Sequence, residues 1–253
     1  MAQQRVLITA GANGIGAAIA ERFAADGAAI FVCDVDAEGL ERLAARLPGL
    51  ATQVCDLSRR EAIGPMVEAA ASTLGGIDVL VNNAGVGGAT VPAHELDPAD
   101  WDRVMDINLD ATFMVTRAAI PYLKASPAGV IINMSSVAGR FGYPNRIAYA
   151  TSKWGLIGFT KTLSMELGAD GIRVNALLPG GVDGERLQRV MEGRAQLSGQ
   201  SLETVREEAM TYQSLKYFVN PRHVADMAAF LASDSGRSIS GQALSIDNDM
   251  QRT

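Results

Sequence analysis

Short runs of apolar residues alternate along this chain with longer segments in which apolar and polar positions recur at helical spacing. The runs that predict β-strands cover residues 5–9, 28–33, 51–55, 77–81, 129–134, 172–178 and 242–246. Most of them are continuously apolar, which is typical of parallel strands buried on both faces by helices. The pattern therefore predicts an α/β fold with a doubly wound, seven-stranded parallel sheet and helices on both faces.

Helix starts are marked by capping residues followed by proline, at Asp97-Pro98 and at Asn220-Pro221. Residues 183–217 break the alternation with a polar, helix-favouring segment. We expect an excursion over the edge of the sheet there, acting as a lid over the substrate, rather than a second domain. The chain is accordingly predicted to form a single domain over residues 1–253.

Composition and charge narrow the classes of partner. Nucleic acid and anionic membranes bind basic surfaces, so a formal net charge of -6 disfavours them as partners. The charge is more compatible with a small-molecule substrate. Cys33 and Cys55 each end an apolar run and are predicted to be buried, reduced thiols, with no metal site. Because neither a targeting leader nor an apolar stretch of membrane-spanning length is visible, a cytoplasmic location is expected.

A glycine-rich turn joins the first predicted strand to a helix-like segment. Glycines there let the backbone approach a pyrophosphate, and the free N–H groups at the helix start favour its charge. A strand-to-helix turn of any kind can use glycine, but this position in an alternating chain favours dinucleotide binding. The predicted cofactor contacts in this turn are Thr9, Gly11, Asn13, Gly14, Ile15 and Gly16.

The second predicted strand is followed by Asp34, about twenty residues after the glycine turn. A carboxylate at this place can accept hydrogen bonds from the adenosine ribose and would repel a 2'-phosphate. Residues 34–38 contain no Arg or Lys to neutralise such a phosphate. NAD is therefore predicted as cofactor over NADP, the alternative being that Asp34 merely caps the next turn.

Three further motifs follow later strands: Asn82-Asn83-Ala84-Gly85, Ser135-Ser136, and Tyr149 with Lys153 at the start of a helix-like segment. Together with the glycine turn they resemble the short-chain dehydrogenase/reductase family, over nearly the whole chain. The resemblance implies a Rossmann-type fold, a nicotinamide cofactor and assembly as a homotetramer.

Tyr149 and Lys153 are the centre of the predicted chemistry. Positions i and i+4 share one helix face, so the ammonium would lie near the phenol and favour the phenolate, which a free tyrosine forms only near pH ~10. The resemblance implies that Tyr149 is the general acid/base and that Lys153 also holds the nicotinamide ribose.

Two further catalytic residues are implied by the resemblance. Ser136 would position the substrate oxygen, with Ser135 as the competing candidate. Asn108 would hold a water in a proton relay behind the lysine, unless it is an ordinary helical asparagine.

Further cofactor contacts are also implied by the resemblance alone. They are Asp56 and Leu57 beside the adenine, Asn82, Ala84 and Gly85 along the adenosine ribose, and Pro179, Gly180 and Val182 at the nicotinamide. His94 and His223 are interpreted as structural, the alternative for His94 being that it lines the substrate pocket.

The chain departs from the family pattern at several positions. Ala10 replaces a glycine, which should be tolerable if the backbone there has negative φ. Gly184 replaces a threonine, so one hydroxyl contact to the nicotinamide is expected to be absent. Asp247-Asn248-Asp249 lacks a family glycine, a change that bears on assembly.

The leading hypothesis is NAD-dependent interconversion of a secondary alcohol and a ketone by hydride transfer, on a sugar, polyol or hydroxy acid. One alternative is a 3-oxoacyl thioester reductase using NADPH, against which Asp34 counts. The other is a nicotinamide-binding protein without catalysis, because a fold does not fix a function.

Overall fold

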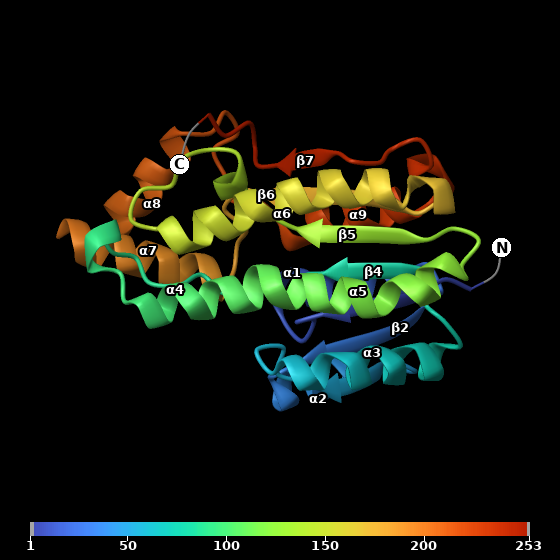
Figure 1. Cartoon of the computed structure of the whole chain (residues 1–253). Coiled ribbons are helices and arrows are strands. Elements are labelled where there is room, and N and C mark those ends of the chain that lie inside the picture. Colours follow the sequence, from blue (N-terminus) through green and yellow to red (C-terminus); the bar gives the residue numbers. More distant parts are fainter. Residues whose placement is uncertain (1–2, 252–253) are drawn as a thin grey trace.

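The computed structural model describes residues 3–251, so the outermost residues of the predicted domain, 1, 2, 252 and 253, lie outside it. The strands it contains form one seven-stranded parallel sheet, which confirms the predicted fold class (Figure 1). They are β1 (Arg5–Thr9), β2 (Ala29–Asp34), β3 (Ala51–Val54), β4 (Val79–Asn82), β5 (Val130–Met134), β6 (Arg173–Pro179) and β7 (Ala243–Ile246).

The strand order is β3-β2-β1-β4-β5-β6-β7. Strands β2 and β3 extend the sheet to one side of β1 and the later strands extend it to the other side, so the order in which strands are added reverses between β1 and β4. Val6 of β1 pairs with Ile30 of β2 on one side and with Val79 of β4 on the other. Ligands of doubly wound sheets bind outside the carboxyl ends of the strands at such a switch point. This edge lies on the left in Figure 1.

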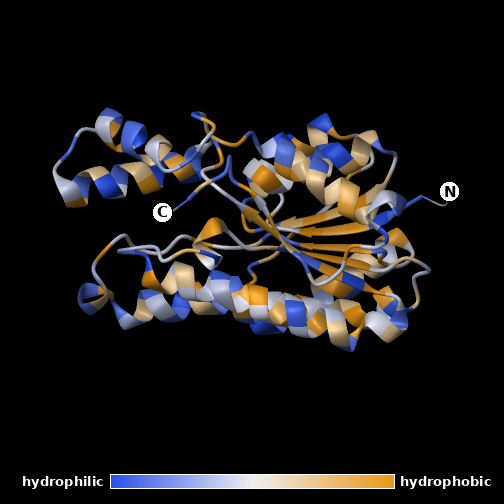
Figure 2. Cartoon of the chain, turned by 90° about the horizontal axis from the view of Figure 1, so that it is seen from above, coloured by the Kyte–Doolittle hydropathy of each residue, from blue (hydrophilic) through white to orange (hydrophobic). Residues whose placement is uncertain are grey.

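Helices cover both faces of the sheet, because successive strand residues point to opposite sides. The helices are α1 (Gly14–Ala25), α2 (Ala37–Arg46), α3 (Arg60–Leu74), α4 (Pro98–Met105), α5 (Ala111–Lys124), α6 (Ile147–Glu166) and α9 (Pro221–Ala232). Val6 and Ile8 of β1 pack in the apolar cluster under α1, α2 and α9, whereas Leu7 packs in the cluster under α3, α5 and α6. Figure 2 shows the apolar strands enclosed between these layers.

The helix starts are capped as predicted. Asp97 accepts a hydrogen bond from the backbone of Ala99 before α4, and Asn220 accepts one from Arg222 before α9. Short 3-10 turns fill connections, and a π-helical turn, η2 (Asp106–Asp110), joins α4 to α5. Cys33 and Cys55 are both buried free thiols.

Residues 183–217 contain two helices, α7 (Glu185–Ser198) and α8 (Leu202–Thr211), which project beyond the carboxyl edge of the sheet (Figure 1). They pack on each other through a small apolar cluster around Met191, Val205 and Ala209. This cluster is separate from the two large ones that flank the sheet. No helix within residues 3–251 is long and apolar enough to cross a membrane.

Candidate active site

The glycine turn leaves backbone donors free at the start of α1. Asn13 occupies the N-cap position of α1 but makes no capping bond, because its side chain donates to Asp36 instead, at 2.7 Å. The first N–H groups of this helix therefore keep no side-chain partner and can receive an anion. Gly14 has φ +56 and open space where a Cβ would stand. These features fit the pyrophosphate of a dinucleotide.

Close packing behind the turn explains the other glycines. A Cβ on Gly16 would lie 2.6 Å from the backbone oxygen of Ala10, and one on Gly11 would lie 2.7 Å from Val32. A side chain at Gly16 would displace the backbone of the turn, and one at Gly11 would displace the buried side chain of Val32. Ile15, between Gly14 and Gly16, is half-buried against the core.

Thr9 and Asn83 tie the turn to the neighbouring strand across the switch point. The hydroxyl of Thr9 accepts hydrogen bonds from the backbone of Asn83 (3.0 Å) and Ala84 (3.1 Å). In return, the Asn83 amide donates to the backbone oxygens of Thr9 and Ala10, at 3.1 and 2.7 Å. Asn83 was not predicted as a site residue, although its place beside Asn82 was the available signal.

Ala10 has a backbone φ of 50, so the condition of negative φ under which its methyl was expected to be tolerable is not met. The left-handed region costs a residue with a Cβ about 1 kcal/mol. The turn holds this conformation because the Ala10 carbonyl accepts the Asn83 amide. The departure from glycine therefore introduces local strain into the turn.

Asp34 lies at the carboxyl end of β2, beside the turn. One carboxylate oxygen accepts a hydrogen bond from the backbone of Ala12 (2.9 Å), and the other accepts one from the backbone of Asp36 (3.1 Å). The side chain is half-buried and is thus held in place with an acidic neighbour at Asp36. Residues 34–38 bring two further carboxylates, of Asp36 and Glu38, which pair with Arg42.

The remaining residues predicted on the adenosine side differ in their exposure and in their hydrogen bonds. Asp56 is exposed, and hydrogen bonds from Ser58 lower its pKa. Leu57 is buried beside it. The Asn82 amide points into the core, where it donates to Thr116 and Asn133 at 2.9 Å each. The predicted contact of Asn82 with the ribose can thus involve only its main chain. Ala84 and Gly85 come shortly after Asn82, beyond the end of β4.

Lys153 is 2% exposed and lies on the first turns of α6 together with Tyr149. Its ammonium donates to the backbone oxygen of Met134 at 2.8 Å and lies 5.7 Å from the centre of the Tyr149 ring. Burial and, to a lesser extent, the charge of Arg186 lower the pKa of Lys153 to about 7. The predicted pair is therefore brought together, with a lysine that can change protonation near neutrality.

The two serines have different surroundings. The Ser135 hydroxyl donates to the backbone oxygen of Lys153 at 2.8 Å and is thereby engaged in holding α6. The Ser136 hydroxyl accepts from the backbone of Ala138 at 3.1 Å, which leaves its own proton free to be donated. This difference supports the choice of Ser136 for contact with the substrate.

Asn108 lies in the π-helical turn η2 and is fully buried. Its amide oxygen accepts from the backbone of Val86 (2.7 Å), and its nitrogen donates to the Val86 oxygen (3.0 Å) and to Ser152 (2.9 Å). A Cβ on Gly85 would meet both the Asn108 oxygen and the Lys153 ammonium at 3.2 Å. The structure thus places Asn108 beside the lysine, at a π-turn of the kind that often marks functional sites.

The predicted nicotinamide contacts follow β6. Pro179 ends this strand, and the backbone of Gly180 donates to the oxygen of Ile246 on β7 at 3.0 Å. Val182 forms a bridge with Val219, which anchors the base of the α7–α8 excursion. Gly184 has φ 143, a backbone that favours glycine, so the family threonine would be strained here.

Arg146 and Arg186 lie close to the Tyr149–Lys153 pair. Arg146 lies 5.1 Å from the centre of its ring, and Arg186 of α7 donates to the backbone oxygen of Gly85 at 2.6 Å. Arg146 was not predicted as a site residue, because its burial is not visible in the sequence. His94 and His223 are both exposed, and His94, 81% exposed, lies next to Glu95.

The geometry of a glycine turn at the switch point, with Lys153 and Tyr149 at the same edge, defines a dinucleotide-binding α/β protein. A family model described as short chain dehydrogenase matches residues 4–195. The chain belongs to this family.

Relatives extend over nearly the whole length of the chain. The 3-oxoacyl-[acyl-carrier-protein] reductase FabG of Thermotoga maritima is 36% identical over 96% of this chain and 96% of its own. The D-beta-hydroxybutyrate dehydrogenase of Cupriavidus necator is 35% identical, with 95% of each chain covered. The crystal structure of an NAD+-bound xylitol dehydrogenase superposes with a TM-score of 0.93 at 31% identity, covering 96% of this chain and 97% of that one.

Proposed function

We propose that this oxidoreductase interconverts a secondary alcohol and a ketone with NAD, on a small sugar, polyol or hydroxy acid. The observation that carries the proposal is the buried Lys153 ammonium beside the Tyr149 ring, at the edge of the sheet where the glycine turn lies. A hydroxy acid dehydrogenase and a polyol dehydrogenase among the similar proteins support this substrate range.

In alcohol oxidation the phenolate oxygen of Tyr149 accepts the hydroxyl proton of the substrate, and in ketone reduction the phenol returns it. Charged Lys153 favours the phenolate and holds the nicotinamide ribose. Ser136 donates a hydrogen bond to the substrate oxygen. Asn108, held by hydrogen bonds with Val86 and Ser152, binds the water of a proton relay behind Lys153. NAD, when bound, supplies the hydride acceptor, and its reduced form the donor.

The remaining predicted residues would bind the cofactor. The free N–H groups at Gly14, Ile15 and Gly16 receive the pyrophosphate, and Asp34 accepts from the adenosine ribose. Preference for NAD over NADP rests on the fixed carboxylate of Asp34 and the acidic residues that follow it.

The test is absorbance of reduced nicotinamide with NAD and NADP in separate assays. The substrates are sugars, polyols, hydroxy acids and secondary alcohols, with oxoacyl thioesters assayed against both reduced cofactors. We expect one class of alcohol to reduce NAD. Equal or higher kcat/KM with NADP would contradict the cofactor assignment.

Two alternatives give other outcomes in the same assay. Turnover of oxoacyl thioesters with NADPH would favour the reductase role, which the similarity to FabG supports. Tight NAD binding without any turnover would favour a non-catalytic nicotinamide-binding protein. The homotetramer, the lid role of residues 183–217, the single-domain organisation and the cytoplasmic location stay predictions.

A further inference from the structure

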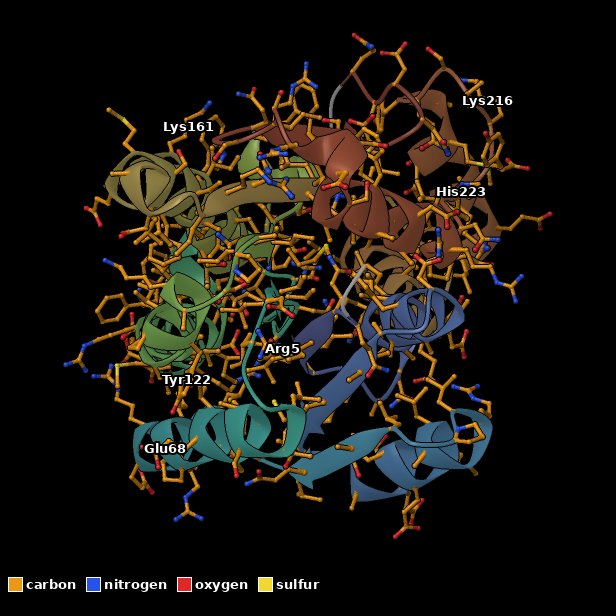
Figure 3. The ribbon with its side chains drawn as sticks, turned by 90° about the vertical axis from the view of Figure 1, so that its right-hand side faces the viewer. Arg5, Glu68, Tyr122, Lys161, Lys216 and His223 are labelled. Carbon is orange, nitrogen blue, oxygen red and sulfur yellow. The ribbon has the colours of Figure 1, made fainter. Side chains whose placement is uncertain are left out.

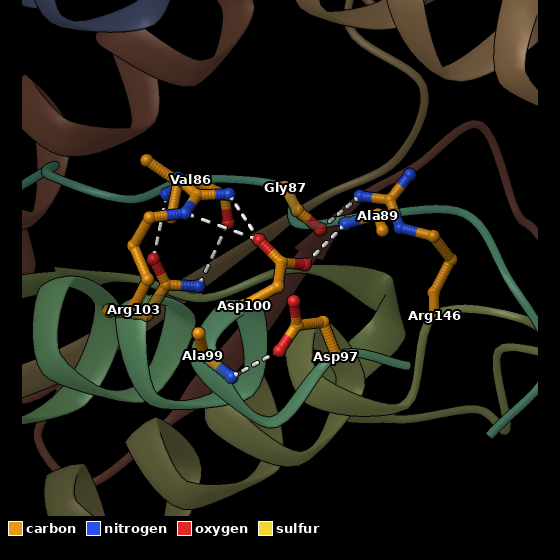
Figure 4. Close-up of polar contacts among 9 residues, drawn as sticks. Val86, Gly87, Ala89, Asp97, Ala99, Asp100, Arg103 and Arg146 are labelled. Atoms are coloured by element: carbon orange, nitrogen blue, oxygen red, sulfur yellow. Dashed lines mark hydrogen bonds and ion pairs between the residues drawn. The ribbon is translucent and has the colours of Figure 1, made fainter. Parts of the chain in front are cut away.

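Arg146 is a buried cation whose charge the described part of the chain leaves without an ion-pair partner. It is 4% exposed and occupies the N-cap position of α6 without making a capping hydrogen bond. One terminal nitrogen donates to the backbone oxygen of Gly87 at 2.8 Å, whereas Nε is buried with no hydrogen-bond partner among the described residues (Figure 4). A buried donor without a partner is unfavourable, and a buried guanidinium without an acid even more so.

A second arginine faces the same aromatic rings from the α7–α8 excursion. Arg194 of α7 lies 5.0 Å from the centre of the Tyr143 ring, and Arg146 lies 5.6 Å from that centre. Tyr143 in turn packs edge-on against Tyr149 with 6.4 Å between ring centres. Two guanidiniums from distant parts of the chain therefore contact the same Tyr143 ring, which packs against the proposed acid/base.

Acidic side chains do not balance this charge. Against the effect of burial, hydrogen bonds from Ala89 and Arg103 lower the pKa of Asp100, and the charge of Arg146 lowers it to a lesser extent. Its oxygens are engaged by the backbone of Ala89 at 2.7 Å and by Arg103 at 2.6 Å (Figure 4). Within residues 3–251, neither Arg146 nor Arg194 has a carboxylate within ion-pair distance.

We propose that Arg146 and Arg194 form a carboxylate-binding subsite, so that the substrate is an anionic hydroxy acid or its keto acid. A guanidinium offers parallel N–H donors that match a carboxylate, and the surrounding burial strengthens the attraction. The acid group binds at the arginines, with α7 moving to admit it, while the carbinol carbon lies at Tyr149. This assignment narrows the proposed function to one of its substrate classes and rests on it.

The competing explanation is structural: Arg146 would only hold the loop at Gly87. A structural role predicts equal effects on charged and uncharged substrates, whereas a carboxylate subsite acts on the charged ones alone. Matched pairs of substrates therefore separate the two explanations.

The experiment compares 2-, 3- and 4-hydroxypentanoate with their uncharged methyl amides as substrates for NAD reduction. The variants are Arg146→Gln, Arg146→Lys and Arg194→Gln. Arg237→Gln is the matched control, because it removes the same charge at the amino-terminal edge, before β7. We expect the wild type to prefer one acid over its amide by about 10- to 100-fold in kcat/KM. Each glutamine variant should reduce that preference, mainly through KM, and Arg146→Lys should retain part of it.

Equal kcat/KM for acid and amide in the wild type, or equal losses for both in the variants, would overturn the subsite. Calorimetric titration of the NAD complex with the same acids and amides separates the two proposals. Oxidation of neutral alcohols, without binding of any acid, would retain the proposed function and overturn the subsite. Acid binding that is lost in Arg146→Gln, without turnover of any compound, would retain the subsite and overturn the proposed function.

Discussion

The floor and the roof of the candidate site are built differently. The floor, which we define as Thr9, Asn83, Asn108 and Ser152, is a set of polar side chains bonded to backbone or to each other. The roof, defined as Arg146, Arg186 and Arg194, presents cations that lack carboxylate partners within the described residues. A satisfied floor is rigid before any ligand arrives, whereas an unbalanced roof gains most from an anion.

Lys153 links the two parts, and among the variants that test this comparison its replacement should have the largest effect. Lys153→Met removes the cation beside Tyr149, so we expect turnover to fall by about 100-fold or more. Lys161→Met is the control and should retain turnover, because Lys161 lies about two turns further along the same helix, on the side of the molecule that faces the viewer in Figure 3.

Lys153→Met should also raise the free energy of unfolding at acidic and neutral pH. Because burial lowers the pKa of Lys153 to about 7 from 10.5, the unfolded chain binds more protons than the folded chain between these values. The wild type therefore gains stability relative to Lys153→Met as pH rises above 7. Denaturant unfolding at several pH values measures the difference, and a variant less stable than the wild type at pH 6 would contradict the cause given.

The two serines should separate function from support. Ser136→Ala is expected to lower kcat by about 100-fold, because it removes the donor to the substrate oxygen. Ser135→Ala removes a hydrogen bond to the Lys153 backbone and should lower the free energy of unfolding by about 1 kcal/mol, with a smaller loss of kcat. Steady-state kinetics and denaturant unfolding decide, and the reverse ranking in kcat would exchange their roles.

Arg186 tests whether the roof acts on Lys153. Its charge lowers the pKa of Lys153, so Arg186→Gln should raise that pKa and move the alkaline limb of kcat/KM to higher pH. Arg206→Gln is the control, because Arg206 instead contacts Gln188 in the excursion and Phe218 just after it. An alkaline limb at the same pH in Arg186→Gln and the wild type would show that the two residues are not coupled.

The smallest expected effect concerns the backbone strain at Ala10, whose carbonyl accepts a hydrogen bond from Asn83 of the floor. Ala10→Gly should raise the free energy of unfolding by about 0.5–1 kcal/mol, because glycine adopts φ 50 without strain. Ala12→Gly, two positions on, should lower it by a similar amount, because that residue has no positive φ to relieve. Thermal unfolding of both variants makes the comparison, and stabilisation by both would indicate another cause.

The apolar runs of the sequence predicted both ends of all seven strands to within two residues. Strands buried on both faces are continuous apolar runs, so their signal does not depend on tertiary detail. The glycine turn and the Tyr149–Lys153 pair were equally accessible, because their meaning lies in short spacings along the chain.

Other features depend on contacts that spacing does not encode. The direction of Asn82 into the core follows from its partners on α5 and β5, Thr116 and Asn133. The positive φ of Ala10 is held by Asn83, which comes from another strand end. Arg146 becomes notable only once its burial and its missing partner are seen.

The most direct test of the central claim is the turnover of Tyr149→Phe with NAD and the alcohol class that the wild type oxidises. Tyr122→Phe is the matched control, since Tyr122 lies on the amino-terminal side of the molecule in Figure 3. We predict that Tyr149→Phe binds NAD as the wild type does and loses turnover by about 100- to 10,000-fold. Undiminished turnover in Tyr149→Phe would contradict the assignment of Tyr149 as the acid/base.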